Sequence, residues 1–140
     1  MPDKIFLDSA YAIALSSSRD MYHQRAMQLA TRLRLEKSRL ITTRAILLEI
    51  GNALSKQRYR AAAVRLLIAL ETDPTVEVIP LTEHLYFRAL EFYQSREDKE
   101  WGLTDGISFV AMTDQQVTEA LTADAHFRQA GFRALLLDEV

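Results

Sequence analysis

Four acidic residues that lie far apart in the chain have the settings of ligands to a cation: Asp8, Glu49, Asp105 and Asp124. Asp8 follows the apolar run IFL, Glu49 lies within AILLEIGNAL, and Asp124 closes the run ALTAD. An ionised carboxylate among such apolar residues is costly to bury unless a positive charge compensates it. The pattern therefore predicts a metal site, in which a divalent ion supplies the compensating charge.

Other kinds of catalytic site find little support in the sequence. The chain contains no Cys, which excludes disulfides, thiolate metal sites and thiol nucleophiles. It also has no GxSxG motif, no P-loop and no dinucleotide-binding glycine motif, and only four glycines in total. The acidic residues are thus the main chemical resource of the sequence.

Length and composition predict a single globular domain over residues 1–140. With 140 residues and 49% hydrophobic content, the chain can bury one core but not two. No stretch approaches the roughly 20 apolar residues of a membrane span, and the N-terminal MPDKIFLDSA is unlike a secretory signal. We therefore expect a cytoplasmic protein that does not enter a membrane.

The charge of the chain is unevenly distributed, although the net charge is only −2. Residues 1–70 hold 12 Lys and Arg against 5 Asp and Glu, whereas residues 71–140 hold 5 against 14. Basic residues concentrate in segments 32–39 and 56–65, the second of which includes Tyr59. Either segment alone is typical of a solvated helix face. Two basic segments converging on an acidic cluster would instead favour nucleic-acid binding.

Short β-like runs alternate with longer helical patterns, which indicates an α/β fold. The strands are expected at 4–7, 39–42, 76–80, 119–124 and 133–137, and the helices at 19–37, 43–56, 58–71, 81–96, 103–112 and 126–132. Thr42 or Thr43, Thr82 and Thr104 are the expected N-terminal caps of three helices. Right-handed crossovers then predict a three-layer α/β/α domain with a parallel sheet of strand order 3-2-1-4-5.

This topology predicts that the four acids meet. Asp8 and Asp124 end the first and fourth strands, which flank the point where the strand order reverses and where open α/β sheets bind ligands. Glu49 faces inward on the helix after the second strand. Asp105 opens the helix that leads into the fourth strand.

At these residues the sequence resembles the PIN-domain family, and within it the VapC-like toxin nucleases, over essentially its whole length. The resemblance rests on an early strand ending in Asp8-Ser9, the helix TRAILLEIGNAL, and the blocks WGLTDGISF and LTADAHFRQAGF, in that order. It implies that Asp8, Glu49, Asp105 and Asp124 bind Mg²⁺ or Mn²⁺ and are the catalytic residues of a metal-dependent endoribonuclease that cleaves single-stranded RNA.

The same resemblance extends to neighbouring residues and to partners. Ser9, Thr104 and Thr122 match the small hydroxyl residues that accompany the acids in the family. The expected partners are single-stranded or structured RNA, a cognate antitoxin protein, and a second copy of the chain in a homodimer. Helices 55–71 and 81–94 carry more apolar surface than one sheet face needs, which also favours the homodimer.

The physical chemistry of the acids agrees with this implication. Mg²⁺ and Mn²⁺ prefer hard oxygen ligands, so three or four carboxylates, water and a phosphate oxygen complete one coordination shell. A capping role remains the alternative for each Asp, above all for Asp124. The main rival function is a non-catalytic PIN-like domain that binds RNA or a partner. A phosphotransfer receiver domain would need an adjacent acidic pair early in the chain and a late Lys, and neither is present.

Several further residues invite a role, but none is expected to join the metal site. His23 and His84 fit structural and surface helix positions, and His126 is expected to face a loop. Arg44 approaches either a substrate phosphate or one of the acids. Trp101 either stacks a base or, as we favour, packs a loop onto the core.

Overall fold

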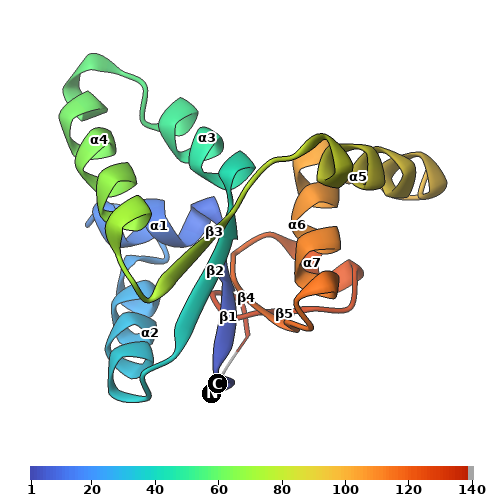
Figure 1. Ribbon diagram of the computed structural model, residues 1–140. Coiled ribbons are helices and arrows are strands. Elements are labelled where there is room, and N and C mark those ends of the chain that lie inside the picture. The colour runs from blue at the N-terminus through green and yellow to red at the C-terminus, as the bar shows by residue number, and fades with distance from the viewer. Residues whose placement is uncertain (139–140) are drawn as a thin grey trace.

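The protein, seen here in a computed structural model that describes residues 1–138, is built on one five-stranded sheet (Figure 1). All the strand pairs are parallel, and their order is β3-β2-β1-β4-β5. The predicted fold class and strand order are therefore confirmed. None of the helices in these residues is long and apolar enough to cross a membrane.

The strands are β1 (Lys4–Leu7), β2 (Arg39–Thr43), β3 (Val76–Ile79), β4 (Glu119–Leu121) and β5 (Arg133–Ala134). The helices are α1 (Ser9–Ser16), α2 (His23–Leu35), α3 (Arg44–Ala53), α4 (Gln57–Thr72), α5 (Glu83–Ser95), α6 (Leu103–Asp114) and α7 (Ala125–Gln129). Strands β4 and β5 are shorter than predicted, because the polar residues after Leu121 and the chain after Ala134 turn away from the sheet.

The helices form two layers on opposite faces of the sheet. Helices α1 to α4 lie on one side and α5 to α7 on the other, as Figure 1 shows. This division follows from right-handed crossovers: the connections that lead toward β3 share one face, and those that lead toward β5 share the other. All five strands end at the same edge of the sheet, where the helices that follow β1, β2, β3 and β4 begin.

The core fills the space between the sheet and both helix layers. Its largest fully buried side chains include Phe6 on β1, Phe127 on α7 and Ile46 on α3. Phe127 links β1 to the layer of α5 to α7, because its ring lies 6.2 Å from that of Phe6. Phe109 on α6 continues the cluster, with its ring 5.0 Å from that of Phe127 and 5.1 Å from that of Trp101. The residues that follow β1, β2 and β4 are therefore anchored to one continuous apolar body.

Helix α1 was not predicted. It is short and almost uniformly apolar, so it lacks the 3.6-residue alternation on which the helix predictions rest. Helix α2 begins at His23 rather than at residue 19, because residues 17–22 form turns. The expected cap at Thr104 is wrong: α6 begins at Leu103, as predicted, with Gly102 at its N-cap position. The caps at Thr43 and Thr82 are confirmed.

The Thr43 cap fixes the start of α3, since its hydroxyl accepts a hydrogen bond from the Ile46 N–H at 3.2 Å. We expect Thr43→Ala to lower the free energy of unfolding by about 1–2 kcal/mol, through loss of the cap and of a buried methyl. Urea denaturation is the measurement. Thr43→Ser, which keeps the hydroxyl, should retain the larger part of that stability, and equal losses in the two variants would contradict the capping role.

Candidate metal centre

Asp8 is a buried carboxylate at the carboxyl end of β1. It occupies the N-cap position of α1 without the usual capping hydrogen bond farther into the first turn, and it is only 7% exposed. Its Oδ2 accepts a hydrogen bond from the Thr122 hydroxyl at 2.7 Å. Burial raises the pKa of Asp8 to about 7, against hydrogen bonds from Thr122 and from the Ser9 backbone that lower it. The charges of Glu49 and Asp105 raise it further.

Glu49 reaches the same place from the neighbouring helix α3. Its Oε1 accepts a hydrogen bond from the hydroxyl of Ser9, the first residue of α1, at 3.3 Å. Partial burial raises the pKa of Glu49, the Ser9 hydrogen bond lowers it, and the charges of Asp105 and Asp124 raise it. The carboxylate of Glu49 therefore lies within electrostatic range of Asp105 on α6 and of Asp124 in the β4–α7 connection.

Asp105 and Asp124 stand at the start of α6 and α7, together with a residue the sequence did not predict. Asp105 Oδ2 accepts from the Gly102 N–H at 3.1 Å, and Asp124 Oδ1 accepts from the His126 N–H at 2.8 Å. His126 Nδ1 lies 3.1 Å from Asp105 Oδ2 and 3.4 Å from Asp124 Oδ1. Each of the three residues offers one ligand atom within 4.8 Å of the others.

The other acids lie close enough to Asp8 and Glu49 for their charges to raise the pKa values of these two, but the four acids are not equidistant. The tight group of potential ligands comprises Asp105, Asp124 and His126, whereas Asp8 and Glu49 are linked to it by charge coupling rather than by ligand atoms at contact. The candidate site therefore comprises all four acids, because carboxylates without a cation between them repel and move apart.

The donor set suits a hard divalent cation. Four carboxylates and one imidazole gather beside two hydroxyls, and the most buried carboxylate has its charged form disfavoured by burial. A divalent ion among these oxygens would supply the missing positive charge. The backbone amides and hydroxyls that hold one oxygen of each Asp leave other oxygens for such an ion.

His126 corrects the expectation that it faces a loop, since its ring lies between two of the acids. The sequence feature that could have indicated this position is the spacing of two residues between Asp124 and His126. An acid at the N-cap and a side chain in the first turn lie at the same end of a helix. His23 is structural as expected, because its Nδ1 lies 2.7 Å from the Ala14 carbonyl oxygen. His84 stays in the first turn of α5.

The remaining candidates lie away from the acids. Arg44 pairs with Glu71 of α4 at 3.2 Å, so it contacts none of the four acids. Trp101 is 5% exposed, stacks on Phe92 with ring centroids 5.8 Å apart, and donates to Gln129. The favoured packing role of Trp101 is therefore the one the structure has.

The two basic segments occupy different edges of the fold. Residues 32–39 join α2 to the start of β2, and Arg39 pairs in register with Lys4 at the edge opposite the acids. Residues 56–65 form the first half of α4, which follows the helix that carries Glu49. Of the two basic segments, only residues 56–65 adjoin a helix that contributes an acid to the candidate metal site.

The fold is that of a known family. The sequence matches the PIN domain over residues 5–133, and the chain therefore belongs to the PIN domain family. Within that family the structure is similar to the VapC20 toxin of Mycobacterium tuberculosis, which cleaves the sarcin-ricin loop: 27% identity, a TM-score of 0.79, and coverage of 91% of this chain and 95% of that one.

More distant structures share the fold. VapBC2 of Rickettsia felis, bound to a fragment of its promoter DNA, has 11% identity, a TM-score of 0.68, and coverage of 94% of this chain and 96% of that one. FitAcB of Neisseria gonorrhoeae has 17% identity, a TM-score of 0.64, and coverage of 93% and 94%. Among curated proteins, none matches this sequence.

The raised pKa of Asp8 has a consequence for stability. The folded-state pKa of Asp8, about 7, exceeds the ordinary 3.8. The contribution of Asp8 to the free energy of unfolding is therefore fully present below pH 4 and is lost as the pH rises to 7. The loss is of order 4 kcal/mol without metal. We therefore expect Asp8→Asn, measured by urea denaturation in EDTA, to be more stable than wild type at pH 8 and to lose that advantage near pH 4.5.

Asp114→Asn is the matched control, because Arg88 lowers the pKa of Asp114 at the surface. It should show no gain at pH 8. An Asp8→Asn protein less stable than wild type at both pH values would mean that Asp8 is a structural cap.

Proposed function

We propose that the protein is a metal-dependent endoribonuclease that cleaves single-stranded RNA and acts as the toxin of a toxin-antitoxin pair. The observation that carries the proposal is the gathering of four acids in a PIN domain, two of which, Asp8 and Glu49, have pKa values raised by burial and by the charges of the other acids. The similarity to the VapC20 toxin supports the choice of RNA as the substrate. The cytoplasmic location expected from the sequence stays a prediction.

The catalytic roles follow from the positions of the side chains. Asp8, Glu49, Asp105 and Asp124 would hold one or two Mg²⁺ or Mn²⁺ ions at the carboxyl ends of β1 and β4. A bound ion would activate a water molecule and neutralise charge on the scissile phosphate. The protein's own part is to fix these oxygens: Thr122 orients Asp8 and Ser9 orients Glu49.

Replacement of a single acid tests the proposed chemistry. We expect Asp8→Asn and Asp105→Asn to reduce Mg²⁺- or Mn²⁺-dependent cleavage of single-stranded RNA about a hundredfold or more, because each removes a ligand of the shared site. Gel analysis of a labelled RNA measures the rate, and circular dichroism should be unchanged. Asp114→Asn, a surface acid paired with Arg88, should cleave as wild type does.

The same assay separates the nuclease from its rival, a non-catalytic PIN-like domain that binds RNA or a partner. Because all four acids and their hydroxyl partners are present, we favour catalysis. Cleavage by Asp8→Asn at the wild-type rate would remove Asp8 from the site, and absence of cleavage by the wild-type protein with both metals would favour the rival.

The antitoxin is the proposed protein partner. Similar folds are found in the VapBC2, FitAcB and FitAB structures, which are toxin-antitoxin complexes. The proposal extends a complex of toxin and antitoxin to this chain. A small neighbouring reading frame that encodes a DNA-binding fold with a basic amphipathic tail would support the toxin role. A gene neighbourhood without such a frame would favour a general RNA-processing enzyme.

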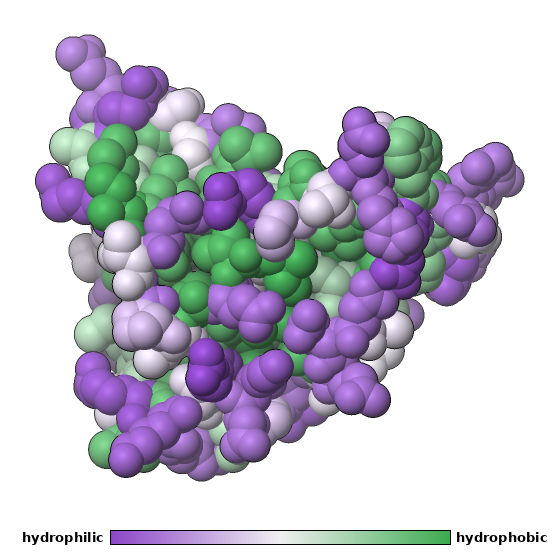
Figure 2. All heavy atoms as spheres, in the orientation of Figure 1, coloured by the Kyte–Doolittle hydropathy of each residue, from purple (hydrophilic) through white to green (hydrophobic). Residues whose placement is uncertain are grey.

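A homodimer is the proposed assembly, and exposed apolar side chains on α3, α4 and α5 support it. Leu48, Ile68 and Phe87 are 58%, 58% and 59% exposed. Figure 2 shows apolar surface on the α3–α4 side and in the hollow between that side and α5, bordered by hydrophilic residues. Such a surface is larger than scattered single residues would give and favours an isologous contact.

Light scattering tests the dimer independently of the chemistry. We expect twice the mass of the 16.0 kDa chain at tens of micromolar protein. Replacing Phe87 and Ile68 with Glu should give the monomer mass, because burying two charges in an apolar contact is costly. A wild-type protein that scatters as a monomer would refute the dimer.

A further inference from the structure

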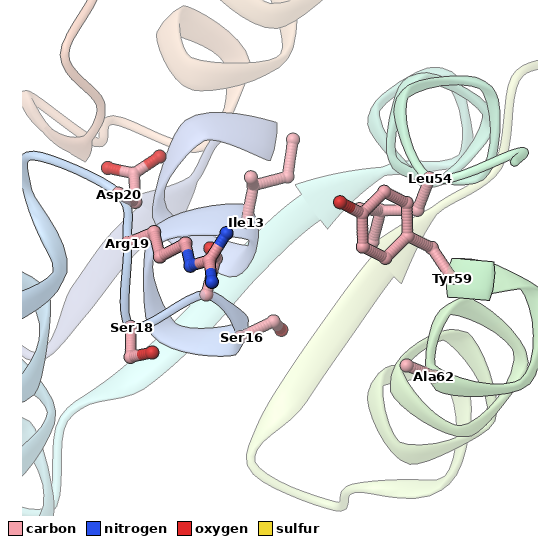
Figure 3. A pocket seen from close by; sticks show the side chains of 9 residues that line it. Ile13, Ser16, Ser18, Arg19, Asp20, Leu54, Tyr59 and Ala62 are labelled. Carbon is pink, nitrogen blue, oxygen red and sulfur yellow. The ribbon is translucent and has the colours of Figure 1, made fainter.

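A cavity of about 520 Å³ lies between the end of α1 and the start of α4, outside the acidic site. Residues from three stretches line it: Ile13 and Ser16–Asp20, Leu54, and Tyr59 with Ala62. In Figure 3, Arg19 and Tyr59 face each other across this space, and the Tyr59 hydroxyl points toward the α1 side. The cavity therefore has an aromatic wall and a cationic wall.

Helix α1 connects the cavity to the acids. Ser9, which donates to Glu49, is followed at the i+4 and i+7 positions by Ile13 and Ser16, which line the cavity. Residues at this spacing lie on one helix face, so a single face of α1 runs from the acids to the cavity. At 1.5 Å per residue, Ser9 and Ser16 are about 10 Å apart along the axis, a few nucleotides of a stacked strand.

The aromatic wall is prepared for stacking. Tyr59 is 41% exposed, and the guanidinium of Arg58 lies over its ring, 4.8 Å from the centroid. The cation holds the ring and adds positive charge beside it. Base–aromatic stacking of this kind is common in proteins that bind single strands, because every base has a π face.

The cationic wall is free to bind an anion. Among the described residues Arg19 has no hydrogen-bond or ion-pair partner, and Lys56 and Arg58 lie beside Tyr59 at the start of α4, outside the lining of the cavity. Asp20 is the one acid in the lining, and its Oδ1 already accepts from the Tyr22 N–H at 2.9 Å. Its second oxygen can accept from an amino or imino group of a base, as the hydroxyl of Ser18 also can.

From these features we propose that the cavity is a subsite for one nucleotide of the RNA substrate, whose base stacks on Tyr59 and whose phosphate pairs with Arg19. This subsite rests on the proposed nuclease function and extends it. It places the strand along α1, with the scissile bond at the acids and a neighbouring base held about one helix length away. A protein segment is the competing occupant, but it would not require both a stacked tyrosine and an unpaired guanidinium.

The test is RNA binding in EDTA, where a metal-dependent nuclease does not cleave. Fluorescence anisotropy with labelled ten-nucleotide single-stranded RNAs of A, C and U gives the Kd. We expect Tyr59→Leu to weaken binding about tenfold and Tyr59→Phe to bind as wild type does, because stacking needs the ring alone. Tyr93→Leu is the matched control, since Tyr93 is 47% exposed on α5.

Arg19 has a different signature. Arg19→Gln should reduce the slope of log Kd against log salt by about 0.7, as expected for one lost phosphate contact to a single strand. Arg39→Gln, at the opposite edge of the sheet, should leave the slope unchanged, and so should Tyr59→Leu. Both positions are exposed, so circular dichroism should show every variant folded.

The outcomes separate the subsite from the nuclease. If wild type binds these RNAs and Tyr59→Leu and Arg19→Gln bind equally well with the same slope, the subsite is refuted and the nuclease is untouched. If binding depends on both residues but wild type with Mn²⁺ does not cleave, the subsite is supported and the nuclease refuted. Wild type that binds none of these RNAs would overturn the subsite, whereas cleavage with Mn²⁺ decides the nuclease separately.

Discussion

The repulsion among carboxylates at one edge of the sheet is the constraint on which this structure depends. Parallel strands end together, so the topology that packs the core also brings Asp8 beside the connection after β4. Burial disfavours the ionised form of Asp8 and raises its pKa to about 7. The chain tolerates this cost because hydrogen bonds hold each acid in place. A cation at the same edge would turn the repulsion into ligation.

The supporting contacts come from elements that are distant in sequence but adjacent in the fold. Thr122 after β4 donates to Asp8 after β1, and Ser9 on α1 donates to Glu49 on α3. The α1 helix thus has two tasks. Its first residue orients an acid, and its later turns line the cavity in which we place a nucleotide. Site and cavity share one rigid element, which fixes the distance between them.

Much of the fold could be predicted from the sequence, because the strands and helix caps depend on local patterns of residues. Alternating apolar runs defined the strands, and the crossover rule then determined their order. Thr43 and Thr82 were predictable caps because a hydroxyl precedes each apolar helix. Helix α1 was missed since its residues are apolar on every side. The cap predicted at Thr104 was wrong because the N-cap position of α6 is occupied by Gly102, which lacks a capping side chain.

The site was predictable to the level of the acids and not beyond. Their settings among apolar residues indicated a common place, whereas the position of the His126 ring between Asp105 and Asp124 depends on how α6 and α7 pack. The spacing of two residues indicates that His126 and Asp124 share one helix end, but no spacing expresses how α6 and α7 pack. The cavity beside Tyr59 has the same origin, because it joins the ends of α1 and α4, which are some 40 residues apart.

The most direct test of the central claim is a crystal of the protein soaked in MnCl₂, with the ion located by its anomalous scattering. The account predicts a peak at the carboxyl ends of β1 and β4, within coordination distance of oxygens from Asp8, Asp105 and Asp124. The same peak should be absent from Asp8→Asn crystals. A wild-type map with no peak among these acids, or a peak that persists unchanged without the Asp8 carboxylate, would contradict it.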